Sequence, residues 1–306
     1  MSAASIWVPA ATGPQSRLLP EPRETRHENR RALQDNGTSC LRVAQGETFQ
    51  IETEDAFTGL IADRLVRRFE ETAVLELDSV ASGYGGIPII RAVSFAAGRG
   101  EIVAIVGRNG VGKTTLVRTI VGLLAANAGR ILFDGRDITR ADASDRARAG
   151  IGYVPQGRDI FGRLTVEENL DMGELVGASG GGSVDRERVF DWFPILRERR
   201  RQRAGTLSGG QQQMLAIGRV LVGQPRLVIL DEPSEGVQPN IVQKIGEIIV
   251  RLNAETALTT LLVEQNIDLV IACAQRCLIM DKGTIIAEIA TGDLANPETA
   301  RRYLSI

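Results

Sequence analysis

The stretch that decides the fold is Ile102-Val103-Ala104-Ile105-Val106-Gly107-Arg108-Asn109-Gly110-Val111-Gly112-Lys113-Thr114. Its first five residues are apolar throughout, which is typical of a strand buried on both faces. The loop 107–114 fits the pattern G-x-x-x-x-G-K-[ST]. A helical pattern of apolar residues follows, formed by Leu116, Ile120, Val121 and Leu124. This strand–loop–helix unit predicts an α/β domain with a largely parallel sheet.

The glycine-rich loop predicts a site for a polyphosphate. Glycines let successive N–H groups point into one concavity, and the helix N-terminus adds positive potential there. We expect Lys113 to reach the β- and γ-phosphates and the Thr114 hydroxyl to bind Mg²⁺. The residues assigned to this site are Gly107, Asn109, Gly110, Gly112, Lys113, Thr114 and Thr115. A chance glycine-rich turn is the competing interpretation, and the strand and helix on either side disfavour it.

A second apolar run, residues 227–230, ends in two adjacent acids, Asp231 and Glu232. Ligands of open parallel sheets bind at the carboxyl ends of the strands. Asp231 is therefore predicted to hold Mg²⁺, directly or through water, and Glu232 to polarise an attacking water as general base. The competing interpretation is a pair of solvated acids at a turn before Pro233. The presence of a phosphate loop in the same chain disfavours it.

Composition excludes several other classes of protein. The 306 residues carry 36 Lys and Arg against 38 Asp and Glu, without the basic excess of a nucleic-acid binder. The chain has neither an apolar run long enough to span a membrane nor the layout of a secretory signal. His27 is the only histidine, which excludes a histidine zinc cluster and a Ser-His-Asp triad from the body of the chain. Cys273 and Cys277 are expected on one helix face as buried small hydrophobes. These features predict a soluble cytoplasmic protein.

Residues 1–73 differ in composition and apolar periodicity from the rest of the chain, which we assign as one α/β domain, 74–306. Prolines, a charged run at 23–31 and weak periodicity predict disorder in the extension. Within it, residues 56–71 have the apolar spacing of an amphipathic helix. An alternative is that the extension is not part of the native product, because a GTG codon for Val74 would be a start site.

The stretch Leu207-Ser208-Gly209-Gly210-Gln211 distinguishes among phosphate-loop proteins. With the phosphate loop, Tyr153-Val154-Pro155-Gln156 and the acids after 227–230, it resembles the ATP-binding subunits of ABC transporters from about residue 75 onward. The resemblance implies the ABC ATPase fold: a mostly parallel core sheet, an antiparallel β subdomain and an inserted helical subdomain at about 157–206. Ser208 and Gln211 also fit a capping box at the start of a helix, and the two interpretations are compatible.

The resemblance also implies roles for single residues. Ser208, Gly209, Gly210 and Gln211 would cover, in trans, the ATP held by the phosphate loop of a second ATPase subunit. Tyr84 stands where the family places an aromatic that stacks on adenine, and a strand-edge aromatic is the competing interpretation. Gln156 would contact Mg²⁺ or the attacking water and respond to the membrane partner.

One position departs from the family pattern. Many members have a histidine after the strand that follows the acids, and here Gln265 stands at that place. Its amide can donate a hydrogen bond but carries no charge. Either hydrolysis persists through Glu232, or this subunit is the weaker site of a heterodimer; a third alternative is a regulatory subunit that barely hydrolyses ATP.

The run Val263-Glu264-Gln265-Asn266 is similar to the ATPases of branched-chain amino-acid and urea importers, and residues 234–239 favour urea. The resemblance implies a Mg²⁺-dependent ATPase on the inner face of the membrane. Its partners would be a second ATPase subunit, two permeases and, indirectly, an extracytoplasmic binding protein, with no nucleic acid. The alternatives are a branched-chain amino-acid importer and a non-transport ABC ATPase. The second ATPase subunit would be either another copy of this chain or a related chain.

Overall fold

The computed structural model describes residues 33–35, 38–42, 48–51, 73–177, 186–296, 298–299 and 301. The predicted helix over 56–71 lies outside the described residues, as does most of the extension. The extension contains three short strands that the sequence did not predict, β1 (Leu33–Asp35), β2 (Thr38–Arg42) and β3 (Thr48–Ile51). They pair antiparallel in the order β1-β2-β3.

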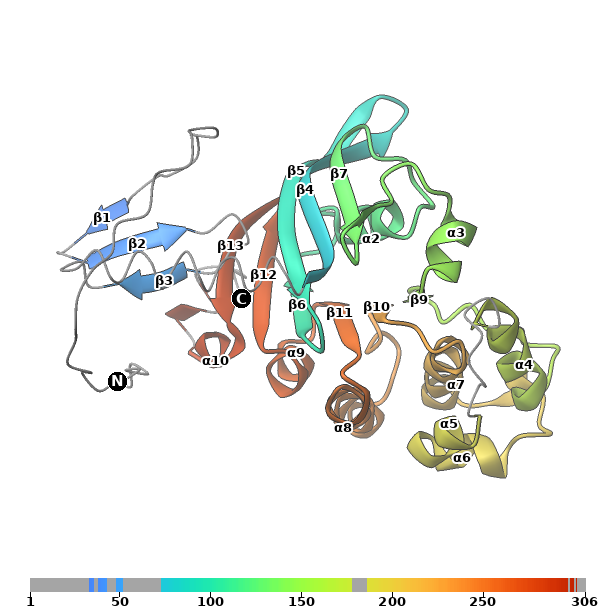
Figure 1. The fold of residues 1–306 in the computed structure, drawn as a ribbon. Coiled ribbons are helices and arrows are strands. Elements are labelled where there is room, and N and C mark those ends of the chain that lie inside the picture. The colour runs from blue at the N-terminus through green and yellow to red at the C-terminus, as the bar shows by residue number, and fades with distance from the viewer. Residues whose placement is uncertain are drawn as a thin grey trace, which may run out of the picture. The chain divides into compact units, whose positions relative to one another are not determined.

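A six-stranded sheet with the order β13-β12-β6-β11-β10-β9 forms the centre of the domain (Figure 1). Its strands are β6 (Ile102–Val106), β9 (Ile151–Val154), β10 (Leu227–Asp231), β11 (Thr259–Glu264), β12 (Arg276–Asp281) and β13 (Thr284–Ala290). All pairs are parallel except β12–β13. Every residue of β6, β10 and β11 is buried, which confirms the prediction of strands covered on both faces.

A second, antiparallel sheet has the order β5-β4-β7-β8. It is formed by β4 (Ala73–Tyr84), β5 (Ile87–Gly98), β7 (Ala128–Phe133) and β8 (Arg136–Asp137). Gly85 and Gly86, both with positive φ, make the two-residue turn between β4 and β5. The sheet therefore places Tyr84 at the tip of a hairpin.

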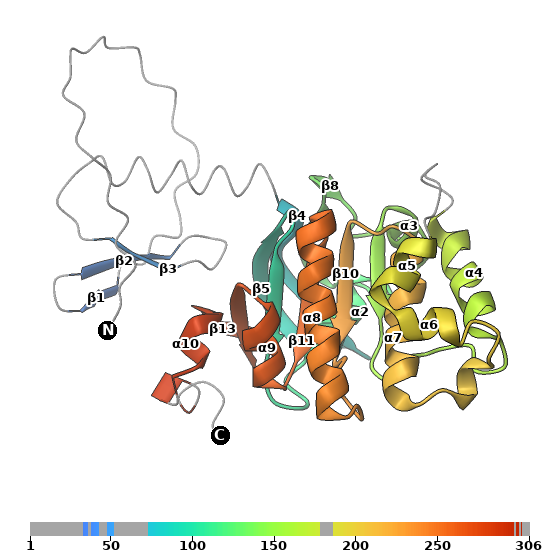
Figure 2. The same ribbon diagram turned by 90° about the horizontal axis from the view of Figure 1, so that it is seen from below.

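The described helices pack on the central sheet or on one another. They are α2 (Lys113–Ile120), α3 (Ala143–Arg148), α4 (Val166–Gly177), α5 (Arg186–Trp192), α6 (Pro194–Glu198), a 3-10 turn (Ala204–Thr206), α7 (Gly209–Val222), α8 (Pro239–Thr256), α9 (Ile267–Cys273) and α10 (Thr291–Leu294). Helices α7, α8 and α9 lie along one face, as seen from below in Figure 2. No described helix is long and apolar enough to cross a membrane.

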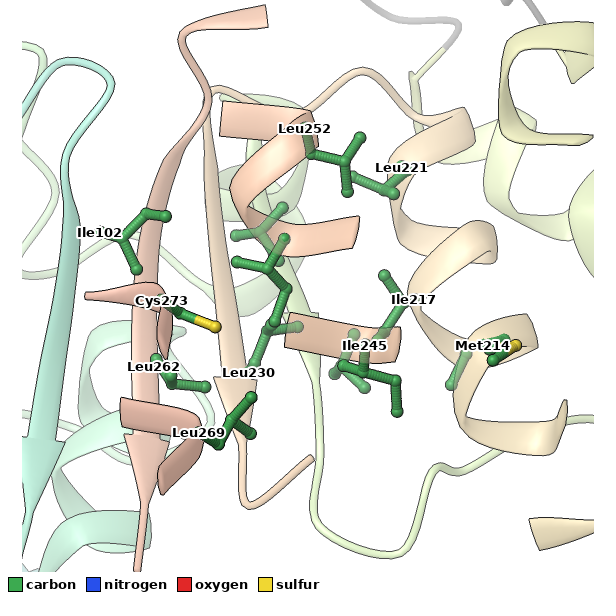
Figure 3. Packing of buried hydrophobic residues seen from close by; sticks show 14 of the residues in the cluster. Ile102, Met214, Ile217, Leu221, Leu230, Ile245, Leu252, Leu262, Leu269 and Cys273 are labelled. Carbon is green, nitrogen blue, oxygen red and sulfur yellow. The ribbon is translucent and has the colours of Figure 1, made fainter. Parts of the chain in front are cut away.

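Alternate residues of each central strand enter different cores. Val103 and Ile105 of β6 pack with α2 and the antiparallel sheet. Ile102, Ala104 and Val106 pack on the other face with α7, α8 and α9. Figure 3 shows this second core, where Leu230 and Leu262 of the strands face Ile217, Ile245 and Leu269 of the helices. Because successive side chains of a strand point to opposite faces, each central strand contributes to both cores, and β6, which leads into the phosphate loop, is held between them.

The placement of the two cysteines was predicted wrongly. Cys273 ends α9, whereas Cys277 lies on β12, so they do not share a helix. The helix stops because Ala274 takes an extended conformation and the chain turns into the strand. Both thiols are nevertheless buried, as predicted, and this burial raises the pKa of each to about 12.

Candidate nucleotide site

The phosphate loop connects β6 to α2, as predicted. Gly112 precedes the helix with φ 112°, a conformation that favours glycine. A Cβ on Gly107 would lie 2.4 Å from the Met280 carbonyl oxygen, so the loop needs a glycine there as well. Asn109 and Gly110 are exposed on the outer side of the loop. Thr115 is buried within α2.

Lys113 is the first residue of α2 and is 4% exposed. Its Nζ donates to the carbonyl oxygens of Gly107 at 2.7 Å and Arg108 at 3.1 Å. The same nitrogen lies 3.3 Å from Glu232 Oε1. The ammonium is therefore held by two carbonyl oxygens of the phosphate loop and is paired with Glu232, the acid after β10.

Three side chains converge on the Glu232 carboxylate. Besides Lys113, Gln265 Nε2 donates to Oε1 at 2.8 Å and Gln156 Nε2 donates to Oε2 at 3.4 Å. Glu232 itself has φ 50°, unusual for a residue with a side chain, and its N–H donates to the Val263 carbonyl. Backbone strain of this kind persists only where the surroundings fix it, and it is common at functional sites.

Asp231 is 1% exposed and lies next to Glu232. Burial, reinforced by the Glu232 charge, raises the pKa of Asp231 to about 6. Tyr153 on the neighbouring strand β9 donates its hydroxyl to Asp231 Oδ2 at 3.3 Å, and Tyr153 and the Thr114 hydroxyl both act to lower the pKa of Asp231 against this rise. Burial of the phenol in turn raises the pKa of Tyr153.

The Asp231 carboxylate retains one buried oxygen, Oδ1, that has no hydrogen-bond partner within the described residues. Such an orphaned anionic oxygen beside a threonine hydroxyl is suited to Mg²⁺, which takes one or two protein oxygens and completes its shell with phosphate and water. Among the described residues, no group of three or more His, Cys, Asp and Glu side chains is placed to hold a metal ion by itself. The donor set thus fits Mg²⁺ that arrives with a nucleotide.

Gln265 bridges the two loops of the site. Its Nε2 also donates to Asn109 Oδ1 of the phosphate loop at 2.6 Å. The preceding residue, Glu264, was not predicted to contribute. Its buried carboxylate accepts N–H bonds from Ser234 at 2.8 Å, Gln265 at 2.9 Å and Asn266 at 3.0 Å. Glu264 therefore ties the loop after Glu232 to the loop that carries Gln265.

Tyr84 is 45% exposed at the end of β4, and its hydroxyl accepts a hydrogen bond of 3.4 Å from Arg118 of α2. The ring is thus held near the helix that follows the phosphate loop and has a face open to solvent.

The stretch 207–211 lies at the start of α7, apart from this cluster. The predicted capping box is present: the Gln211 N–H donates to Ser208 Oγ, and the Ser208 N–H donates to Gln211 Oε1. Gly209 and Gly210 form the first turn of the helix. No hydrogen bond or ion pair of the described residues joins 208–211 to Lys113 or Glu232 of the same chain.

Comparison with known proteins decides the family. The family model described as "ABC transporter" matches residues 90–235. The chain is 43% identical to the high-affinity branched-chain amino acid transport ATP-binding protein BraG of Pseudomonas aeruginosa, over 76% of this chain and 99% of BraG. The chain is an ABC transporter ATP-binding subunit. A second relative, the "Probable branched-chain amino acid transport ATP-binding protein LivF" of Archaeoglobus fulgidus, is 34% identical over 71% of this chain and 92% of its own.

Solved structures agree with this family assignment. A nucleotide-free ATP-binding cassette from an ABC transporter superposes with a TM-score of 0.65 and 28% identity, over 76% of this chain and 99% of that one. The predicted ABC ATPase fold is therefore confirmed. Membership in this family of ATP-binding subunits implies ATP hydrolysis that drives transport.

Proposed function

We propose that this subunit binds Mg²⁺–ATP at the phosphate loop and hydrolyses it to power an importer of branched-chain amino acids. The observation that carries the proposal is the convergence of Lys113, Gln156 and Gln265 on Glu232. It joins a phosphate-binding cation and two amides at the carboxylate of a candidate base.

Glu232 acts as the general base in this mechanism. It accepts a proton from water as the water oxygen bonds to the γ-phosphorus and the bond to the β-phosphate oxygen breaks. Lys113 stabilises the charge that develops on the phosphates. Lys113 and Glu232 are paired, so a γ-phosphate bound by Lys113 would compete with Glu232 for the ammonium. Gln265 and Gln156 then remain as the donors that orient the carboxylate.

Thr114, Asp231 and Gln156 would hold the Mg²⁺, which supplies charge neutralisation on the β- and γ-phosphates when bound. Tyr84 would stack on adenine. Asn109, Gly107, Gly110, Gly112 and Thr115 shape the phosphate cradle.

A second subunit completes the site. Because 208–211 lies apart from Lys113 in one chain, we assign Ser208, Gly209, Gly210 and Gln211 to the nucleotide of a partner cassette. The N-terminus of the 14-residue helix α7 offers N–H groups and positive potential to the phosphate.

We expect this subunit to dock on permeases at the inner face of the membrane, and a groove of about 420 Å³ on its surface supports that expectation. Exposed apolar side chains line it, among them Leu123, Phe161, Met172 and Val176. Contiguous apolar surface of this kind marks interaction sites. An extracytoplasmic binding protein would deliver the substrate to the permeases.

The substrate we propose differs from the one that residues 234–239 favoured. Urea is not supported by the relatives, whereas both BraG and LivF carry the name of branched-chain amino acid transport. Vesicles containing this subunit with its permeases and binding protein should take up leucine in the presence of ATP. The same vesicles with Glu232→Gln should not. Uptake of urea and not leucine would contradict the substrate but leave the ATPase assignment intact.

A further inference from the structure

The segment after Gln156 has an unusual backbone. Gly157, Arg158 and Asp159 have φ values of 86°, 75° and 52° in succession. Two of the three carry side chains, for which this left-handed region is strained. The contacts of the segment must therefore hold it in this conformation.

The Arg158 guanidinium contacts two other segments, a turn and the start of a helix. Its Nη2 donates to the carbonyl oxygens of Glu235 at 3.2 Å and Gly236 at 3.0 Å, in the turn after Glu232. Its Nη1 lies 3.5 Å from Gln212 Oε1 in the first turn of α7. The Gln212 amide nitrogen donates to the Leu207 carbonyl at 3.1 Å, which directs its oxygen toward Arg158. One planar group thus joins the segment after Gln156, the turn after Glu232 and the start of α7.

Packing around this guanidinium is tight. A Cβ on Gly209 would lie 3.1 Å from both Nη1 and Nη2, and one on Gly236 would lie 3.3 Å from Nη2. The guanidinium is therefore in contact with the helix turn that we assign to the partner's nucleotide. Its position and that of Gly209 depend on one another.

The other side of the strained segment faces the apolar groove. Arg219 Nη2 donates to the Asp159 carbonyl at 2.8 Å, and its guanidinium lies over the Phe161 ring at 4.9 Å. Phe161 and Arg219 both line the groove. The segment 157–161 therefore connects the groove to the start of α7.

We propose that Arg158 is a positioning residue for the trans half of the nucleotide site. It sets the place of Ser208 and Gly209 relative to the turn after Glu232, so that the start of α7 can close on ATP bound by the partner. The inference rests on the proposed function. It adds a specific consequence: the loss of Arg158 impairs the nucleotide held by the other subunit and spares the nucleotide held by its own chain.

The first test measures ATP-induced dimerisation in a Glu232→Gln background, where hydrolysis does not reopen the dimer. Arg158→Ala should raise the ATP concentration for half-maximal dimerisation at least tenfold. Arg158→Lys should have an intermediate effect, because an ammonium keeps the charge but lacks the fork of donors. Arg163→Ala, an exposed arginine nearby, is the matched control and should change it less than twofold.

Binding of a fluorescent ATP analogue to the isolated subunit, below the dimerisation range, separates folding from positioning. Arg158→Ala should bind within twofold of the parent. Loss of this binding would show that Arg158 acts on its own nucleotide or on the fold, and would overturn the proposal, as would dimerisation at the parent's ATP concentration. A parent that never dimerises with ATP would contradict the proposed function instead.

Mixed dimers of differently tagged chains, again with Glu232→Gln, test the trans assignment. Lys113→Ala and Arg158→Ala on different chains leave one complete site and should occlude one ATP per dimer. On the same chain they leave none and should occlude no ATP. The reverse result, or one ATP in both arrangements, would refute the trans role.

Discussion

Removing the charge of Asp231 should stabilise the nucleotide-free protein at neutral pH. Asp231 is buried beside Glu232, and its pKa is raised from 3.8 to about 6. A carboxyl whose pKa is raised on folding binds more protons in the folded than in the unfolded state. Its contribution to stability is complete below pH 3.8 and is lost as the pH rises through about 6.

The size of the effect follows from the difference between the two pKa values, about 2 units. At about 1.4 kcal/mol per unit this corresponds to about 3 kcal/mol of unfolding free energy lost above pH 7. Asp231→Asn does not carry this cost, and its side chain can still accept the Tyr153 hydroxyl bond. The variant should therefore be more stable than the parent by up to about 3 kcal/mol at pH 7.5.

Urea denaturation with EDTA present measures this difference. The gap between Asp231→Asn and the parent should close as the pH is lowered from 7 to 4. Asp145→Asn, an exposed acid on α3, is the control and should leave the unfolding free energy within about 0.5 kcal/mol. A variant no more stable than the parent at pH 7.5, or a gap independent of pH, would refute this account of the Asp231 environment.

Substitutions at three further positions test other parts of the site. Gln265→Ala should lower kcat of ATP hydrolysis about tenfold, because Glu232 loses the Gln265 amide that donates to it at 2.8 Å. Gln265→His should have a turnover equal to or below that of the parent. Full activity in the alanine variant would contradict this role of Gln265. Glu264→Gln should reduce the unfolding free energy by about 1–3 kcal/mol, because one amide oxygen cannot accept from all three N–H groups that bond the carboxylate. A denaturation midpoint equal to that of the parent would argue against the role of Glu264 in joining the two loops. Ser208→Ala should cost about 1 kcal/mol through the lost helix cap and should also weaken ATP-induced dimerisation; a loss of stability alone would leave Ser208 only its capping role.

The sequence predicted the features that local pattern and motif spacing determine. The strands of the phosphate loop and of the acid pair, the capping box at Ser208 and the buried faces of the central sheet all follow from short runs of residues. Parallel strands bring their carboxyl ends together, so Lys113 and Glu232 were expected to lie close to each other.

Contacts that depend on tertiary placement were not predictable. Arg158 reaches carbonyl oxygens 77 and 78 residues away, and Glu264 accepts an N–H bond from a loop 30 residues earlier in the chain. Tyr153 belongs to the motif that ends in Gln156, but only its pairing with Ile229 beside Asp231 shows why a hydroxyl is placed there. The cysteine error has a similar cause: a spacing of four residues suggested one helix, whereas the chain turns into β12 between them.

Glu232 is the general base of the proposed ATPase, and its replacement is the most direct test of that role. Steady-state ATP turnover of the purified subunit, with Mg²⁺, should fall by at least about 100-fold in Glu232→Gln, the range expected for the loss of a general base. Binding of ATP should be retained, because Lys113 and the phosphate loop are unchanged. Turnover by Glu232→Gln at the rate of the parent would contradict the central claim.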